Sequence, residues 1–202
     1  MQRAFTLTLA THLSTRVGAA LHLGAAACLS AAVCFSMLGC SSAGPYGHSR
    51  VYSPLAAERA ALEGAVEYDP VMATRNPEAW QGKPISLFGV VVSRDAGSGG
   101  TSQLKLSLRT LEPRNLCEEE AEDSCRVTVS DREHAVVHAH VALSGDDDLG
   151  RYSVGGGSLV RLVGELTDDF SEDGTPLFRA TYYRHWPRGF YVTTADRGRM
   201  RR

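Results

Sequence analysis

The chain has 202 residues, of which 43% are hydrophobic and 22% are charged, and this composition and length argue for one globular domain with appendages. Residues 1–39 contain two arginines and no acid, so the remainder carries 19 basic and 23 acidic residues. That net negative charge excludes steering of polyanions by the whole molecule, and we expect no nucleic-acid partner.

Residues 1–39 have the pattern of an export signal. Residues 1–16 form a basic, Ser/Thr-rich start, and residues 17–38 contain no formally charged side chain. This is the order of the n-region and h-region of a signal peptide. About 20 apolar residues can also span a bilayer, so a retained transmembrane helix is the alternative. The Ala/Gly-rich composition and the Gly39–Cys40 junction favour a cleaved signal.

Met37-Leu38-Gly39-Cys40 resembles the lipobox of bacterial lipoprotein signals. Glycine lets a peptidase approach the backbone closely, and the Cys40 thiol is the nucleophile for diacylglyceryl transfer. The resemblance implies cleavage between Gly39 and Cys40 and a covalent lipid on Cys40, and we expect no other cofactor. Acyl chains contributing ~0.8 kcal/mol per buried methylene would anchor the protein. Ser41 follows the cysteine in place of Asp, which by resemblance favours the outer membrane, with the domain facing the periplasm.

Residues 40–52 are expected to be a lipidated flexible tether, and residues 53–82 to form short helices. Ser53-Pro54 resembles a helix start, and we expect a helix over residues 55–66 that Asp69-Pro70 ends. Residues 76–82 are expected to form one capped turn closed by glycine.

Residues 83–192 are expected to form a small five-stranded barrel. The β-like stretches are 85–92, 104–108 (continued by Val127 and Val129), 135–143, 158–166 and 177–183. The first is a near-continuous apolar run that predicts a strand buried on both faces, with a bend or bulge at Gly89. In the second, leucines alternate with polar residues and should point inward. Glycines near the middle of the first and fourth stretches, and a longer connection between the third and fourth, indicate an OB-like barrel.

Five segments in this order resemble the Slp family of outer-membrane lipoproteins. They are WQGK at 80–83, FGVV at 88–91, LKL at 104–106, LVRLVG at 159–164 and YYRHW at 182–186. The resemblance covers about half of the chain and implies an OB-like β-barrel behind a lipid anchor. It implies location and architecture, not a molecular activity.

Cys117 and Cys125 bracket an acidic insert, CEEEAEDSC. A disulfide between them would close a nine-residue loop, and chain entropy would contribute roughly 2.5 kcal/mol. The acidic side chains are hard oxygen donors suited to calcium, but the spacing lacks the glycine turn and terminal Glu of an EF-hand. A solvated acidic loop is therefore the favoured interpretation.

His138 and His140 would share one face of a strand, as a zinc or copper site requires. Neither H-E-x-x-H nor a zinc-finger spacing is present, so a third ligand must come from elsewhere, and the acidic insert is one source. Two exposed histidines on an edge strand without a function are the favoured alternative.

The aromatic residues near the C-terminus interleave with arginines, a composition typical of single-strand stacking grooves, although the expected compartment argues against nucleic acid. Alternation places Phe178 and Tyr182 in the core and leaves Tyr183, Trp186 and Tyr191 as surface aromatics for glycan, peptide or lipid headgroups. The alternative is that they close the bottom of the barrel.

No nucleophile elbow, P-loop or dinucleotide fingerprint occurs, so we expect no enzyme. The leading hypothesis is an envelope lipoprotein with a non-catalytic binding or structural role. The second is a metal- or small-ligand-binding periplasmic module at His138 and His140, and the third is a hydrolase with an unrecognised site. Residues 193–202 are expected to be a disordered basic tail that contacts anionic lipid or lipopolysaccharide, or only a solvated end. Another envelope protein is the remaining partner class.

Overall fold

The computed structural model describes residues 46–47, 49–97, 100–114 and 126–198, and every structural statement below concerns these residues. The described residues all belong to one compact unit within residues 43–202. Within the described ranges, no helix is both long enough and apolar enough to cross a bilayer.

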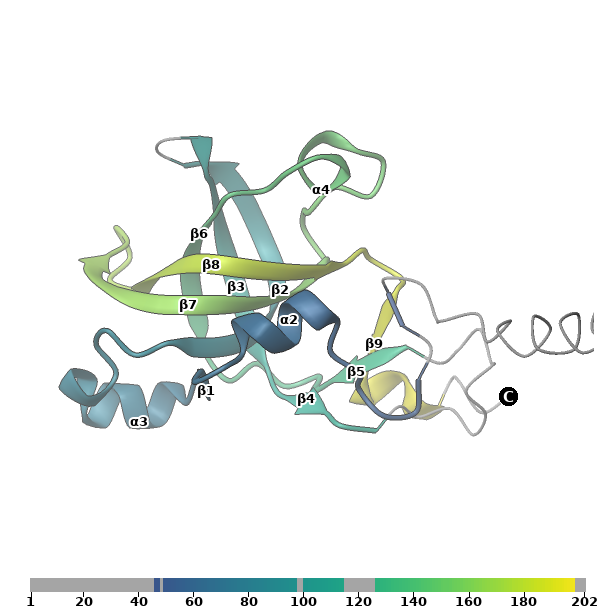
Figure 1. Ribbon diagram of the computed structural model, residues 1–202, viewed down its shortest axis with the longest axis horizontal. Coiled ribbons are helices and arrows are strands. Elements are labelled where there is room, and N and C mark those ends of the chain that lie inside the picture. Colours follow the sequence, from purple (N-terminus) through teal and green to yellow (C-terminus); the bar gives the residue numbers. More distant parts are fainter. Residues whose placement is uncertain (1–45, 48, 98–99, 115–125, 199–202) are drawn as a thin grey trace, which may run out of the picture. The chain divides into compact units, whose positions relative to one another are not determined.

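The fold is mainly β, and its principal sheet closes on itself (Figure 1). Its main strands are β2 (Ile85–Ala96), β3 (Ser102–Arg109), β6 (Val136–Val141), β7 (Leu159–Phe170) and β8 (Pro176–Trp186). They pair in the order β2-β3-β6-β8-β7, and β7 pairs back onto β2. All of these pairings are antiparallel except that of β6 with β8. The arrangement is consistent with the predicted OB-like barrel.

The barrel interior is apolar, as the two-residue period predicted. Leu104, Leu106 and Leu108 of β3 are at most 4% exposed. They pack with inward side chains of the other four strands in one cluster. The residues of β2 from Ile85 to Gly89 are all buried, which confirms a strand covered on both faces for this part of the predicted run. At its end Val92 is 55% exposed, so the prediction of burial on both faces is wrong there.

The bend predicted at Gly89 lies elsewhere. The register of β2 against β3 shifts between Val91 and Ser93, past the glycine. Gly89 instead allows close approach of two strands, because a Cβ atom at this position would lie 3.0 Å from the Cβ of Leu106. The glycine marks tight packing and not a bulge.

The helix predicted over residues 55–66 is shorter in the structure, and a second helix that follows it was not predicted. Helix α2 spans Ala56–Ala61, and Gly64 then takes a left-handed conformation (φ +75°) that turns the chain into strand β1 (Val66–Glu67). Asp69 begins helix α3 (Pro70–Arg75), since its carboxylate accepts from two backbone N–H groups of the first turn. The predicted turn near residue 80 is confirmed as a 3-10 helix, η1 (Pro77–Ala79), followed by Gly82 at φ +64°.

Both ends of the domain are more ordered than expected. From Tyr46 on, the predicted tether packs against the barrel: Tyr46 and Tyr52 join a hydrophobic cluster, and Val51 forms a β-bridge with Arg114. At the other end Tyr191–Thr193 forms strand β9, and Thr194–Gly198 forms a 3-10 helix, η3. The prediction of a disordered tail beginning at residue 193 is therefore wrong for this part, and residues 199–202 lie outside the described residues.

A second, smaller sheet covers part of the outside of the barrel. It contains β4 (Leu111–Glu112), β5 (Val127–Val129) and β9. Val127 and Val129 were predicted to continue a barrel strand, but they belong to this smaller sheet. They pack with outward residues of β2, β7 and β8 in a second cluster. The connection between β6 and β7 contains a single helical turn, α4 (Asp146–Leu149).

Candidate functional site

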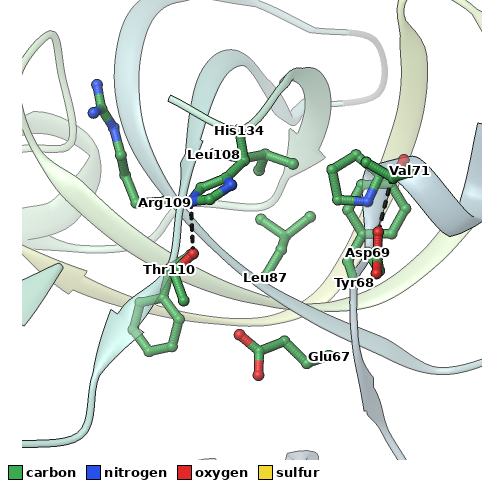
Figure 2. Close-up of a pocket in the computed structure, with 11 residues that line it drawn as sticks. Glu67, Tyr68, Asp69, Val71, Leu87, Leu108, Arg109, Thr110 and His134 are labelled. Carbon is green, nitrogen blue, oxygen red and sulfur yellow. Dashed lines mark hydrogen bonds between the residues drawn. The ribbon is translucent and has the colours of Figure 1, made fainter. Parts of the chain in front are cut away.

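A pocket of about 580 Å³ lies beside the ends of β1, β2 and β3 (Figure 2). The side chains of Leu87 and Leu108 provide its apolar part. Tyr68 lies on one side, with its ring 5.6 Å from that of Trp80 in an edge-on contact. Burial, with the charge of Asp69, raises the pKa of the Tyr68 hydroxyl, so this wall stays a neutral hydrogen-bonding group.

The polar groups of the pocket face each other across this floor. On one side lie the carboxylates of Glu67 and Asp69, of which Asp69 is held by the first turn of α3. On the other side, the Nε2 atom of His134 lies 2.7 Å from the Thr110 hydroxyl, the contact dashed in Figure 2. Arg109 also lines this side, but its guanidinium points away from the pocket in Figure 2 and donates to the Asp131 carbonyl. An apolar floor with carboxylates on one side and a His–Thr pair on the other suits a small amphipathic ligand.

A hydrogen-bonded chain of Asp147, His185 and Ser158 lies where the α4 turn meets β7 and β8. The Asp147 carboxylate lies 2.7 Å from His185 Nδ1, and the Ser158 hydroxyl lies 3.1 Å from His185 Nε2. Because a carboxylate only accepts, Nδ1 carries the proton and Nε2 accepts from the serine. The order of partners is that of a serine hydrolase triad.

The surroundings of Ser158 do not support acyl transfer. Its hydroxyl is buried, and it accepts from the Gly155 N–H at 3.3 Å. Two further amides of this turn are also engaged: the N–H of Gly157 donates to the Val91 carbonyl at 2.8 Å and that of Ser158 to the Gly155 carbonyl at 2.9 Å. An oxyanion hole needs such donors free to meet the developing charge. The chain therefore supports a positioning role, in which His185 ties α4 to the barrel.

The most buried charged group is Glu58 of α2, which is 0% exposed. Its Oε1 accepts from Arg161 at 2.9 Å and from the Tyr52 hydroxyl, and its Oε2 accepts from Arg184 at 2.7 Å and from the Leu55 N–H at 3.1 Å. We call Tyr52, Glu58, Arg161 and Arg184 the carboxylate clamp. Arg161 and Arg184 are directly paired across β7 and β8, so the sheet places two cations around one anion.

Aromatic rings complete the surroundings of the clamp. The Arg161 guanidinium lies 4.8 Å from the centre of the Phe88 ring, and that of Arg184 lies 4.5 Å from the Trp186 ring. Burial alone would raise the pKa of Glu58, but hydrogen bonds from Tyr52 and the two arginines outweigh it and lower that pKa. The clamp therefore holds an ionised carboxylate and fixes the N-terminal segment to the barrel.

His138 and His140 lie on one face of β6, as predicted, but the structure does not bring a metal site together around them. His138 Nε2 lies 3.3 Å from a carboxylate oxygen of Asp173, and its Nδ1 lies 3.4 Å from the Gln103 amide nitrogen. Lys105 binds the same Asp173 oxygen at 3.1 Å, where a metal ion would compete with it. Across the described residues, no group of three His, Cys, Asp or Glu side chains has metal-site geometry. The acidic insert at 117–125 lies outside these residues.

The three aromatics predicted to be on the surface differ in burial. Trp186 is 0% exposed, so its expected surface position is wrong; its indole N–H donates to the Tyr46 carbonyl at 3.1 Å. Tyr191 is half-buried and donates to Gly157 at 2.9 Å. Tyr183 is half-buried against the interior core. A register shift between Ala180 and Tyr182 exchanges the faces of the residues that follow in β8, and this turns Tyr183 toward the interior. Trp186 faces outward and is buried because the second cluster covers that face.

The remaining predicted site residues fall on parts of the chain that the structure does not describe. Gly39 and Cys40 of the lipobox and the Cys117–Cys125 pair are all outside the described ranges. Their predicted roles in cleavage, lipidation and disulfide formation stay predictions.

Sequence reasoning missed the clamp and the His185 chain. Glu58 occurs in a helical segment rich in Ala and Glu, where an acid is ordinarily solvated, and nothing local predicts its burial. The one available signal was the outward position of Arg161 and Arg184 on strands that are otherwise apolar. His134 and Thr110 of the pocket come from connections for which no pattern predicts a position.

No family model matches the chain, and no curated protein matches it. Among solved structures, the protein priB from Ralstonia solanacearum is similar over 51% of this chain and 97% of that chain, with 15% identity and a TM-score of 0.27. At that TM-score the likeness carries no argument. The resemblance to the Slp family stays a prediction.

Proposed function

We propose that this chain is a lipid-anchored lipoprotein of the cell envelope, held at the outer membrane and facing the periplasm, whose barrel binds a ligand or partner without catalysis. The observation that carries the proposal is where the folded domain begins. Tyr46 already packs against Phe190, with ring centres 4.6 Å apart, and only five residues separate it from Cys40. A lipid on Cys40 would therefore hold a folded domain close to the bilayer surface.

The pocket beside β1 and α3 supports a binding role. It combines an apolar floor with acid groups on one side and His134 on the other, and a ligand of matching polarity would be oriented by both. The Ser158–His185–Asp147 chain favours binding over hydrolysis, because its serine is buried and the neighbouring amides are occupied. An OB-like barrel also presents such a pocket on a rigid support.

Metabolic labelling tests the anchor. Cells expressing the full chain are supplied with a labelled fatty acid, and the protein is compared with a Cys40→Ala variant. We expect label and a shortened chain for the parent, and neither for the variant. Equal labelling of both proteins, or a parent that keeps its leader, would refute the lipoprotein proposal.

The binding role is tested in the lipidated protein by ligand-detected magnetic resonance with small amphipathic amines and carboxylates. We expect signals that weaken in a Val71→Trp variant, which places a bulky ring at the pocket edge, and persist in a Val92→Trp variant at an equally exposed valine outside the pocket. Identical signals for both variants would remove the pocket as the site.

A further inference from the structure

An aromatic stack joins the first described residue to the α4 connection. The ring of Tyr46 lies 4.6 Å from that of Phe190, and the ring of Phe190 lies 5.6 Å from that of Tyr152. Tyr152 follows α4, and Phe190 follows β8. The point at which the chain enters the domain is therefore continuous with the α4 connection.

This part of the surface exposes apolar side chains next to arginines. Leu149, at the end of α4, is 88% exposed, more than any other exposed large hydrophobic residue of the described chain, and Tyr152 is 45% exposed. The guanidinium of Arg151 lies 5.4 Å from the centre of the Tyr152 ring, and Arg188 is exposed two residues before Phe190. We call this the docking face; it comprises Tyr46, Leu149, Arg151, Tyr152, Arg188 and Phe190.

The three aspartates of α4 do not make the docking face strongly acidic. Asp148 is paired with Arg94, and Asp147 is hydrogen-bonded to His185. Asp147 keeps its negative charge, because burial lowers the pKa of His185 and leaves that ring neutral. Asp146 and Asp147 therefore stand against the two cations Arg151 and Arg188. The face thus combines exposed apolar side chains with charges that balance.

We propose that the docking face rests in the headgroup layer of the bilayer that holds the lipid of Cys40. The inference depends on the proposed lipid attachment. A lipid surface is favoured over a protein because Tyr46, separated from Cys40 by only five residues, is itself part of the face. Tyrosine is enriched at membrane interfaces, leucine partitions into the acyl boundary, and guanidinium groups pair with lipid phosphates. The anchor thereby also orients the barrel, with the opposite β7–β8 hairpin directed into the periplasm.

The test uses full-length protein that the cell has processed, purified with its lipid and reconstituted into vesicles of phosphatidylethanolamine and phosphatidylglycerol. Leu149→Trp places a fluorophore on the docking face, and the matched control Phe170→Trp places one on the β7–β8 hairpin, where the native side chain is 67% exposed. The parent protein supplies the background from its native Trp80 and Trp186. Lipids with brominated acyl chains then quench only fluorophores that reach the interface.

We expect the Leu149→Trp signal to shift to shorter wavelength and to lose intensity in brominated vesicles, while the Phe170→Trp signal does neither. The mass of the group on Cys40 is measured on the same samples. If the lipid is present and Leu149→Trp is not quenched, or both variants are quenched equally, the docking face is overturned and the anchor stands. If Cys40 carries no lipid, the proposed function and the docking inference both fail.

Discussion

The inside and the outside of the same strands are stabilised in different ways. The interior of the barrel is a cluster of apolar side chains from all five strands. On the outer face of β7 and β8, Arg161 and Arg184 instead surround the buried carboxylate of Glu58, among the rings of Phe88 and Trp186. An apolar interior accepts any apolar side chain of suitable shape, whereas the two arginines of the outer cluster need a carboxylate at the position of Glu58. The comparison teaches that the N-terminal segment is attached by specific charges and not by hydrophobic burial alone.

The largest effect is expected for Glu58→Gln. Glutamine keeps the shape but removes the negative charge, and Arg161 and Arg184, at 13% and 5% side-chain exposure, lose their counter-ion. Breaking a buried pair from one side costs about 3–5 kcal/mol in the free energy of unfolding. Urea titration followed by circular dichroism measures the loss. Glu63→Gln, an exposed position just beyond the same helix, is the control and should change little.

A triple variant sharpens the same comparison. Replacing Glu58, Arg161 and Arg184 together by Leu, Leu and Met removes every charge of the pair and fills the space with apolar atoms. Such replacements are neutral or stabilising by roughly 1–4 kcal/mol in other proteins. If the triple variant is as unstable as Glu58→Gln, the cluster depends on its hydrogen-bond geometry, and the account of unpaired charge is wrong.

In the interior, Leu106→Ala should lower the free energy of unfolding by about 2–5 kcal/mol, because apolar burial is lost and a cavity is left behind. Leu106 is 0% exposed, and it packs beneath Gly89 of the neighbouring strand. The matched control is Val92→Ala, at 55% exposure on β2, which should be almost neutral. The same urea titration applies. Equal losses at both positions would mean that the barrel interior is not the main core.

The His185 chain predicts a dependence on pH. Burial lowers the pKa of His185 below its ordinary value of 6.5, and this outweighs the opposing effect of Asp147. The unfolded chain therefore binds a proton at higher pH than the folded chain. The stability contributed by the neutral ring is complete above about pH 6.5 and is lost as the pH falls through that value toward the lower folded pKa.

We expect the thermal midpoint of the parent to fall between about pH 7.5 and about pH 5, and that of His185→Gln, which cannot titrate, to fall less. Differential scanning calorimetry at both pH values measures the difference between the two proteins. His134→Gln, at an exposed histidine, is the control and should follow the parent. A variant whose midpoint falls as steeply as the parent's would exclude His185 as the titrating group.

The smallest effect is expected for an exposed ion pair on the same strands. Arg179 and Glu165 lie 3.9 Å apart with side chains 65% and 45% exposed. Solvent-exposed ion pairs contribute roughly 0–1 kcal/mol to the free energy of unfolding. Glu165→Gln should therefore leave the urea midpoint nearly unchanged. A loss comparable to that of Glu58→Gln would show that burial is not what separates the two pairs.

The local pattern of apolar residues was sufficient to predict the barrel strands. The alternation of Leu104, Leu106 and Leu108 predicts an inward face whatever the partner strand is, because side chains of a strand alternate strictly. The apolar run from Ile85 likewise predicted burial on both faces. The same reasoning failed for Tyr183, since one extra residue in β8 exchanges its faces and leaves no mark in the hydrophobic pattern. It also failed for Trp186, which faces outward but is buried by the second cluster.

The sequence by itself determined the lipobox at Cys40 as a prediction, the apolar interior and the approximate positions of the five strands, because each depends on neighbours in the chain. Only the tertiary structure decided that Glu58 is buried. Its partners Arg161 and Arg184 lie 103 and 126 residues away, and the strand pairing that sets the two arginines side by side must form before the site exists. The same holds for Tyr46 and Phe190, whose contact places the docking face at the entry of the chain. Contacts between distant segments follow from how the sheet closes, and no local spacing encodes that closure.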